Sequence, residues 1–508
     1  MQEQNKSLKT IAKGAGYVFV GLVISKLLTL VYRMIVARIG TEEYGVLSLG
    51  LAIVGILGFI PLLGLDQGIL RYVPYYLEKN KIKKAKSTII ISLMFSLSLS
   101  IILAIIVFIF SKEISLLLFK NTELIPVLKI LIMGLPFLVI GSLFLAVIRA
   151  FKNAKYFAII KNITENVVKV ILTFFLLLLG FELIGAATAY LIAIISTAVI
   201  SFYMVKKNML NIFSHKLNTY SKVKGLFSYS IPLMFHFLVI QVVAWTDILM
   251  IGFFRTESEV GIYNAAFPTA TIASMVPEGI IILFIPVMVG LLAKNNMEEF
   301  KKTFKTSTNW IFIFNLPIFL IIALFSKQIL KILFGQSYIS GYIPLLILIP
   351  SYFTYHLFTT SSRVLNVLKK SKYLMINITI AAIINILLNY LLIPRTDFFG
   401  GMVGGAIATS TSLIIYGLLC GIESYYFTKI NPFQRKQIKI LFAGVISISI
   451  AYYFFNMIQN RTFINLGLVA ILFILIYGTL ILLLKCLTKY DYEIMNSMKS
   501  RIKSLLKF

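Results

Sequence analysis

Acidic residues are scarce in this chain of 508 residues, which has 19 Asp and Glu against 48 Lys and Arg. Cysteine is nearly absent, and two residues cannot build a disulfide framework or a cysteine metal cluster. Histidine occurs only three times, and the chain contains no G-x-x-x-x-G-K-[ST] sequence. The sequence therefore predicts no metal site, no resident cofactor and no P-loop ATPase.

Apolar residues are abundant instead: 59% of the chain is hydrophobic, only 13% is charged, and the mean hydropathy is +0.93. Soluble domains are roughly 45–50% apolar, so we expect an all-α integral membrane protein. A helix needs roughly 20 apolar residues to cross a bilayer core of about 30 Å. Fourteen such runs are found, near 14–38, 44–73, 87–111, 125–150, 156–179, 183–205, 226–254, 261–292, 307–333, 342–368, 373–394, 402–428, 439–458 and 465–486.

The formal net charge of +29 is explained by where the basic residues lie. With an even number of spans both termini share one side, where the loops and tails hold 33 Lys and Arg against eight on the other. This asymmetry predicts a plasma-membrane protein with both termini in the cytoplasm. The surplus then faces lipid headgroups, and no nucleic-acid partner is needed to explain it.

The loops are short. The longest internal one runs from Lys206 to Gly225, so a soluble catalytic domain has no room on either side. An enzyme, such as a membrane glycosyltransferase, is therefore not expected.

The chain repeats itself at an offset of about 215–220 residues. Gly40–Ser48 resembles Arg255–Tyr263, and the match aligns Gly45 with Gly261. Three further pairs match, namely Lys112–Phe119 with Lys327–Phe334, Phe151–Tyr156 with Leu368–Tyr373, and Gly185–Thr188 with Gly405–Ala408. Each repeat holds six spans, so both enter the membrane from the same side as parallel repeats.

The repeat predicts three regions. Residues 1–205 form an N-lobe of six spans, 206–428 form a C-lobe of six, and 429–508 add two helices and a basic cytoplasmic tail. In transporters built this way the lobes rock about a site near the midplane.

Two segments of the first repeat resemble a known family. Tyr32–Ser48 and Leu63–Pro74, the latter with the pattern G-L-x-x-x-x-x-R-x-x-P, are similar to segments of the Wzx-like polysaccharide-transporter flippases of the MOP (multidrug/oligosaccharidyl-lipid/polysaccharide) superfamily. The resemblance implies that a lipid-linked oligosaccharide, carried on a polyprenyl or dolichyl (pyro)phosphate, is moved to the outer leaflet for surface polysaccharide or glycoprotein glycan assembly. It also implies glycan-assembly enzymes as partners.

Basic residues inside the spans predict where the substrate's phosphate binds, because an ionised side chain at membrane depth usually faces protein or water. The candidates for a cationic central cavity are Lys26, Arg33, Arg71, Lys161, Lys169 and Arg363. Simpler explanations stay open for four of them. Arg33 could extend to the outer interface, Arg71 could anchor to inner headgroups, and Glu165 could neutralise either Lys161 or Lys169 within its own helix.

Four acids inside the spans are candidates for coupling transport to a proton or sodium gradient, or for charge pairs: Asp66, Glu165, Asp247 and Glu278. Asp66 needs a partner, for which Lys26 and Arg71 are the candidates. Glu278 lies between Pro277 and Gly279, where a kink is allowed. Asn385 and Asn389, one helical turn apart, are expected to make interhelical hydrogen bonds.

The charges inside the spans sum to +4 in the first repeat and −1 in the second. This polarity favours an anionic substrate in the first lobe, moved by alternating access. The alternative is a cation-coupled multidrug exporter of the MATE (multidrug and toxic compound extrusion) type. It is disfavoured because the net positive first lobe would repel a cation, and because the first span holds Lys26 and Arg33 without a carboxylate.

Overall fold

The structure is a computed structural model, and it describes residues 2–208, 225–458, 463–487 and 491. Every regular element in these ranges is an α-, 3₁₀- or π-helix, and none is a strand. The predicted all-helical membrane fold is thereby confirmed. Residues 492–508, which hold most of the predicted basic tail, lie outside the described residues.

Thirteen helices of the described ranges are long and apolar enough to cross a membrane, which makes the chain a multi-pass membrane protein. The predicted span at 156–179 is helical but is not among them. It consists of α9 (Ala154–Phe157), the π-helix η2 (Ala158–Thr164) and α10 (Glu165–Leu178). Lys161, Glu165 and Lys169 lower its hydropathy and η2 divides it, so fourteen spans stay a prediction.

Contacts divide the chain into two compact units. Unit 1 comprises residues 1–268, 333–344 and 378–412, and unit 2 comprises 269–332, 345–377 and 413–508. Unit 1 draws on both predicted repeats, whereas unit 2 holds only segments of the second repeat and of the C-terminal region, so the lobe boundaries at 205 and 428 stay a prediction.

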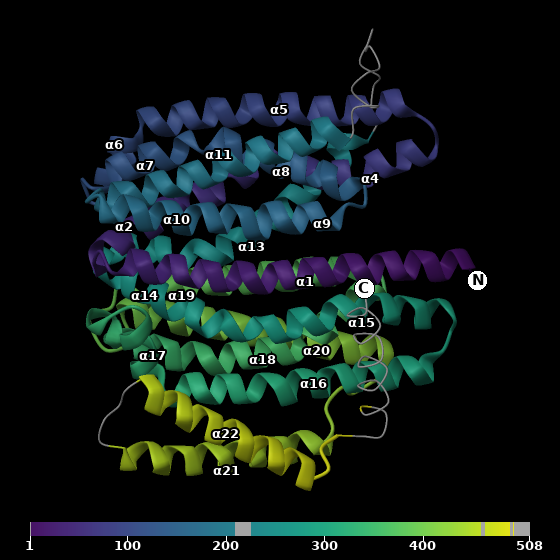
Figure 1. The fold of residues 1–508 in the computed structure, drawn as a ribbon, viewed down its shortest axis with the longest axis vertical. Coiled ribbons are helices and arrows are strands. Elements are labelled where there is room, and N and C mark those ends of the chain that lie inside the picture. Colours follow the sequence, from purple (N-terminus) through teal and green to yellow (C-terminus); the bar gives the residue numbers. More distant parts are fainter. Residues whose placement is uncertain (1, 209–224, 459–462, 488–490, 492–508) are drawn as a thin grey trace. The chain divides into compact units, whose positions relative to one another are not determined.

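Unit 1 is a bundle in which α8 packs against α4, α5 and α11, while α1 packs on α10 and α13 packs on α2 and α4. Figure 1 shows α5, α7, α8, α10 and α11 running side by side. Besides α9, η2 and α10, unit 1 contains α1 (Gln2–Ala37), α2 (Thr41–Leu57), α3 (Phe59–Leu62), α4 (Leu65–Glu78), α5 (Ile82–Ile109), α6 (Ser111–Glu113), η1 (Ile114–Leu118), α7 (Leu124–Met133), α8 (Leu135–Ala150), α11 (Glu182–Asn208), α13 (Leu226–Phe254) and η4 (Gln336–Gly341). It also holds most of α14 (Glu257–Thr271) and parts of α18 (Tyr342–Val367), α19 (Ser371–Leu392) and α20 (Gly401–Thr428).

Local sequence explains how these helices begin and pack. The side chain of Asn121 accepts from the amide of Leu124 at the start of α7, and Asn153 caps α9 in the same way. Serines at intervals of four residues make one face of α5 narrow and buried, and small residues of this kind let helices approach closely in membranes. They are Ser92, Ser96 and Ser100.

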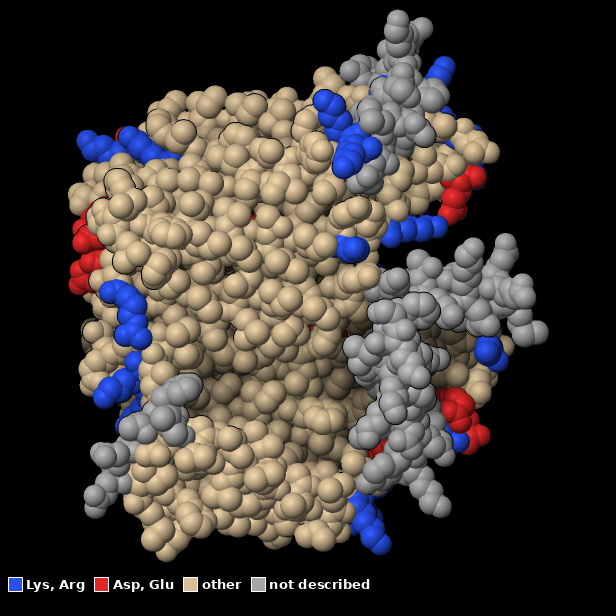
Figure 2. Space-filling model, viewed as in Figure 1, with Lys and Arg blue, Asp and Glu red and all other residues tan. Residues whose placement is uncertain are grey.

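The outward surface of unit 1 fits a lipid environment. Large apolar side chains stand exposed on α5 and α10, among them Ile102, Ile109, Phe175 and Leu178. Exposing such a surface to water costs free energy, whereas contact with lipid tails does not. Figure 2 shows the charged atoms of this unit near the ends of its helices, with an almost uncharged surface between them.

The predicted second span is broken into separate helices. The sequence predicts one span over 44–73, but α3 ends at Leu62 and α4 begins at Leu65. Between them Leu63 and Gly64 have φ angles of 49° and 67°, in the left-handed region that glycine tolerates best. In the other repeat α14 ends at Thr271 and the 3₁₀ turn η3 (Ile272–Ser274) follows. By the alignment of Gly45 with Gly261, this interruption matches the end of α2 at Leu57 and not the break at Leu63 and Gly64.

Alanine in place of Gly64 is expected to lower the melting temperature by several degrees. Its Cβ would lie 2.2 Å from the carbonyl oxygen of Ser230 at a positive φ, and strain of this kind costs roughly 1–3 kcal/mol. Thermal unfolding of the purified protein, followed by size-exclusion chromatography, measures the change. Gly290→Ala is the control, since a Cβ there meets nothing within 4 Å. Equal melting of both variants would contradict the assigned backbone.

Unit 2 is built around α16 (Met297–Leu324), which packs against α15 (Met275–Ala293), α21 (Arg435–Met457) and α22 (Phe463–Leu483). It also contains α17 (Ser326–Leu333) and most of α18. Ile311, Leu316 and Ile440 form part of its core. The Tyr477 hydroxyl of α22 donates to the carbonyl of Ile313 at 2.9 Å. The two helices outside the repeat thus pack against each other and on α16.

Candidate functional site

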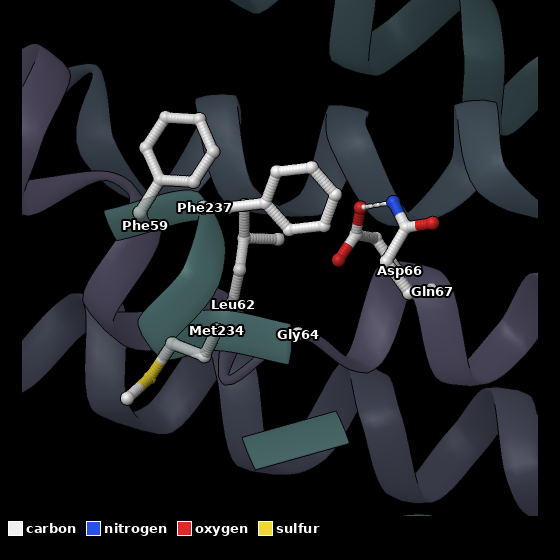
Figure 3. Close-up of a pocket in the computed structure, with 7 residues that line it drawn as sticks. All are labelled: Phe59, Leu62, Gly64, Asp66, Gln67, Met234 and Phe237. Carbon is white, nitrogen blue, oxygen red and sulfur yellow. Dashed lines mark hydrogen bonds between the residues drawn. The ribbon is translucent and has the colours of Figure 1, made fainter. Parts of the chain in front are cut away.

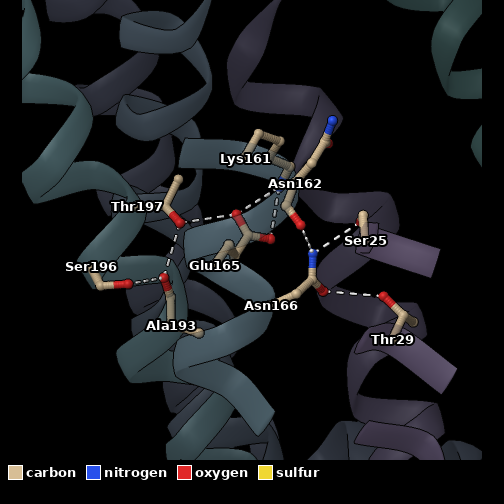
Figure 4. A network of polar contacts seen from close by, with 9 residues as sticks. All are labelled: Ser25, Thr29, Lys161, Asn162, Glu165, Asn166, Ala193, Ser196 and Thr197. Atoms are coloured by element: carbon tan, nitrogen blue, oxygen red, sulfur yellow. Dashed lines mark hydrogen bonds and ion pairs between the residues drawn. The ribbon is translucent and has the colours of Figure 1, made fainter. Parts of the chain in front are cut away.

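A polar network joins α1 to the interrupted fifth helix of unit 1 (Figure 4). The Asn166 amide of α10 donates to Ser25 Oγ at 3.0 Å and to the carbonyl of Asn162 at 2.9 Å. Thr29 Oγ1 donates to Asn166 Oδ1 at 3.1 Å. Just before Asn166, the π-helix η2 makes a wider turn of a kind that is frequent at functional sites.

The interrupted fifth helix also carries an ion pair between two of its own residues. Lys161 Nζ lies 2.8 Å from both carboxylate oxygens of Glu165, and Thr197 of α11 donates to Glu165 Oε2 at 3.0 Å. The pairing within one helix that the sequence left open is therefore present. Lys161 is exposed, so its ammonium can still meet a ligand.

Lys169 is not exposed, although its spacing from Lys161 predicts that both lie on the same face of the helix. Its side chain is buried, with its ammonium 4.8 Å from the ring centre of Tyr32 and 5.6 Å from that of Tyr190. Helical spacing alone could not show this, because the π-helical turn of η2 shifts the register and α11 covers the helix there.

Arg33 reaches across to the second repeat. Its Nη1 donates to the hydroxyl of Tyr44 at 3.2 Å and to both oxygens of Asn264, at 3.0 and 3.1 Å. Lys26, two helical turns earlier on α1, is half-buried. The two basic residues of the first span thus have different surroundings.

Around Arg33, α2 and α14 meet at what we call the outer junction, formed by Thr41, Gly45 and Ser48 of α2 with Ser258, Gly261 and Asn264 of α14. Ser258 Oγ donates to Thr41 Oγ1 at 2.9 Å, and Asn264 Nδ2 donates to Ser48 Oγ at 2.5 Å.

Backbone meets backbone at the centre of the outer junction. A Cβ on Gly45 would lie 1.9 Å from the carbonyl oxygen of Glu257, and one on Gly261 would lie 2.0 Å from that of Thr41. The two glycines aligned by the repeat are therefore each other's neighbours. Predicted topology places this contact on the outer side.

A pocket of about 150 Å³ opens beside the break in the second span (Figure 3). Its lining residues are Phe59, Leu62, Gly64, Asp66, Gln67, Met234 and Phe237. The Asp66 carboxylate accepts from the Gln67 amide at 2.6 Å, rather than from Lys26 or Arg71 as the sequence suggested. Arg71 is exposed and lies 4.1 Å from the ring centre of Tyr229.

Asp247 of α13 is the most enclosed of the predicted acids, at 3% exposure. It accepts from Asn389 at 2.7 Å and Asn385 at 3.2 Å, both on α19. Thr409 of α20 donates to it at 2.5 Å, and Tyr263 of α14 donates as well. The interhelical role expected for the two asparagines is confirmed, with a carboxylate as their acceptor.

The remaining two candidates lie in unit 2. Arg363 is exposed on α18, and Glu278 is half-buried on α15. Near them in the same unit, the Asn377 amide donates to Glu423 at 2.7 Å. In unit 1 the structure thus brings Lys26, Arg33, Lys161, Glu165 and Lys169 together on the packed helices α1, η2 and α10. Asp66 and Arg71 lie on α4 and Asp247 lies on α13, while Arg363 and Glu278 belong to unit 2.

Several residues of these sites were not singled out from the sequence. They are Tyr32, Ser48, Tyr190, Tyr263, Asn264 and Thr409. For Ser48 and Asn264 a signal existed, because they lie three residues after the aligned glycines Gly45 and Gly261. The others are ordinary residues of apolar helices, and only packing shows what they contact.

Comparisons with known proteins agree with this architecture. The family model described as polysaccharide biosynthesis protein matches residues 11–292, and the MatE family model matches 232–391. A membrane protein of Methanocaldococcus jannaschii is 25% identical over 429 residues, which is 78% of this chain and 80% of that protein. The probable low-salt glycan biosynthesis flippase of Haloferax volcanii is 25% identical over 276 residues, 53% of this chain and 56% of its own.

A solved structure shares the fold. The lipid II flippase MurJ, in an inward closed conformation, matches with a TM-score of 0.72 at 18% sequence identity. The match covers 91% of this chain and 97% of that chain. At this identity the likeness speaks for the fold alone.

Proposed function

We propose that this chain, which belongs to the polysaccharide biosynthesis protein family, moves a lipid-linked oligosaccharide from the cytoplasmic to the outer leaflet of the plasma membrane. A relative over half of the chain is named as a glycan biosynthesis flippase. The superfamily consists of transporters, so the chain is not an enzyme. The proposal includes cytoplasmic termini, as the basic loops favour, and partners that build or attach the glycan.

The observation that carries the proposal is the accessibility of basic residues in the first repeat. Lys26 of α1, Arg71 of α4 and Lys161 of η2 lie within predicted spans, and each is half-buried or exposed. A charge in lipid is expensive, so such groups belong to an aqueous path. Lys and Arg there suit a phosphate, Arg through paired hydrogen bonds and Lys as a point charge.

The geometry suggests how the two ends of the substrate are treated. The phosphate and sugars follow the polar side chains of α1, η2 and α10, where Ser25, Thr29 and Asn166 offer hydrogen bonds. The polyprenyl tail stays in lipid along the exposed apolar helices. The closed outer junction would have to open to release the sugar outside, which is one half of an alternating-access cycle.

Asp247 is the group we assign to coupling. A lone carboxylate buried among neutral donors is costly, by several kcal/mol per ion in general, and a bound cation would relieve that cost. The cluster also contains an acceptor that has no partner within the described residues, Asn389 Oδ1. One carboxylate with amide and hydroxyl oxygens is a hard-oxygen set, which suits Na⁺, or H⁺ on the carboxylate itself.

The family's multidrug branch supplies a second candidate function. The MatE model matches residues 232–391, and the pocket beside Asp66 offers a carboxylate within apolar walls. An exporter of small organic cations would use that pocket. The basic groups of α1 and η2 oppose this function, since they would repel such a substrate.

Reconstitution tests the proposal. Purified protein in liposomes is expected to move a fluorescent polyprenyl-diphosphate oligosaccharide between leaflets. The double variant Lys26→Met/Arg71→Met is expected to slow this at least tenfold, because two phosphate contacts are lost. Lys152→Met is the control, since Lys152 is exposed and only approaches Glu78 at 3.5 Å.

Two results would count against it. Full transport by the double variant would remove the cationic path. Transport of an organic cation such as ethidium, without any movement of the lipid-linked sugar, would favour the second function.

A further inference from the structure

The ammonium of Lys169 is a positive charge enclosed in unit 1. The side chain is 7% exposed and lies where α10 packs against α1 and α11. Its contacts in the described part of the chain are the ring faces of Tyr32 and Tyr190. Among these residues it meets no carboxylate and no hydrogen-bond acceptor, so its three N–H donors are unused.

Two buried hydroxyls, one on α1 and one on α10, are also unused. Tyr32 of α1 is 4% exposed, and its OH has no hydrogen-bond partner in the described ranges. The same holds for Thr173 Oγ1, fully buried one helical turn after Lys169. Buried polar groups in native proteins are nearly always satisfied. Donor groups on two helices here lack an acceptor.

The nearby protein groups do not supply one. Glu165, four residues before Lys169, is the carboxylate that acts on the ammonium through its charge, but its oxygens are held by Lys161 and by Thr197. Arg33 adds a further positive charge nearby, and its hydrogen bonds go to Tyr44 and Asn264. The local balance is thus positive, and a ring face compensates a cation only in part.

We propose that Lys169, Tyr32 and Thr173 bind a small monovalent inorganic anion of the chloride class within the first repeat. The anion accepts from the ammonium and the two hydroxyls and makes the buried lysine electrically neutral. A monatomic ion suits the place, because a side chain this enclosed leaves no path for the phosphate of a lipid-linked sugar. The proposal does not depend on the transported substrate.

Halide-dependent stability of the purified full-length protein tests this. Melting is compared in sodium chloride, sodium bromide and sodium gluconate at equal ionic strength, so that sodium and screening stay constant. A ligand that binds only the folded state raises stability in proportion to the logarithm of its concentration. Both halides are expected to raise the melting temperature above that in gluconate, with saturation.

Variants localise the effect. Lys169→Met is expected to abolish the difference between chloride and gluconate. Tyr32→Phe keeps the ring but removes one hydrogen bond, so the half-saturating chloride concentration should rise about tenfold. Lys129→Met is the matched control, because Lys129 also lies over a ring, that of Phe108, at 5.3 Å. It should respond to chloride as the unaltered protein does.

Three results would overturn the proposal: equal melting of the unaltered protein in chloride and gluconate, a chloride response retained by Lys169→Met, or stabilisation by phosphate without any by halide. If Lys169→Met does not fold, Tyr32→Phe and Thr173→Val decide the matter. Both preserve size and should weaken the halide response, and an unchanged response in both would also overturn it.

Discussion

Valine in place of Gly45 is expected to stop transport, by at least a tenfold loss of rate, without preventing the protein from reaching the membrane. The Cβ would lie 1.9 Å from the carbonyl oxygen of Glu257, so α2 and α14 could no longer touch. With the outer junction held apart, a cycle that needs this side to close cannot be completed. Gly261→Val should behave alike, since its Cβ meets the carbonyl oxygen of Thr41 at 2.0 Å.

Cross-linking shows whether closure is the cause. The Oγ1 atom of Thr41 and the Oγ atom of Ser258 lie 2.9 Å apart. The double variant Thr41→Cys/Ser258→Cys should therefore form a disulfide that holds the outer junction closed, and transport should stop until the disulfide is reduced. Adding Gly45→Val should lower the cross-linking yield severalfold. Gly50→Ala on the same helix is the control, because its Cβ meets only the flexible side chains of Leu131, Val127 and Leu124. Normal transport by the oxidised pair would show that the junction does not open.

Asparagine in place of Asp247 is expected to remove the dependence of transport on an ion gradient and to slow transport at least tenfold. The amide has nearly the shape of the carboxylate but carries no charge to attract a cation. Transport is measured with imposed sodium or proton gradients. Melting in sodium chloride is compared with that in choline chloride, because a cation at a hundred times its Kd adds about 2.7 kcal/mol of stability.

A second substitution separates the two ions. Asn389→Ala removes the oxygen without a partner together with the amide that donates to Asp247, so it should weaken sodium binding, while Asp247 can still take up a proton. Asp397→Asn is the control for charge. That residue is exposed, and its hydrogen bond with Arg395, at 2.5 Å, holds the pKa of the carboxyl below its usual range. An unaltered protein that responds to neither gradient would exclude Asp247 from coupling.

Much of the helical framework was predictable because hydrophobic length is a strong signal in lipid. The predicted span at 226–254 coincides with α13, and 342–368 differs from α18 by one residue. The break at Leu63 and Gly64 was not foreseen, since a left-handed pair leaves the hydropathy unchanged. The π-helix η2 was missed for the same reason.

The sequence indicated which residue types would form the sites, but it did not indicate which residues they would contact. Asp247 stood out as an acid in a span, yet its four donors come from α14, α19 and α20, far apart in sequence. Lys161 and Lys169 look equivalent by spacing, but one is exposed and the other enclosed. Whether an intramembrane charge meets water or protein depends on neighbouring helices, which local sequence does not contain.

The contact between Gly45 and Gly261 has the form of a symmetric dimer interface inside a single chain. Each glycine lies against the backbone of the other's helix, as equivalent residues do about a two-fold axis. A six-helix protein pairing with its own copy could make this contact with one glycine used twice. Gene duplication and fusion would preserve it, while neighbours such as Ser48 and Asn264 became free to differ, so that the Asn264 side chain now accepts a hydrogen bond from Arg33.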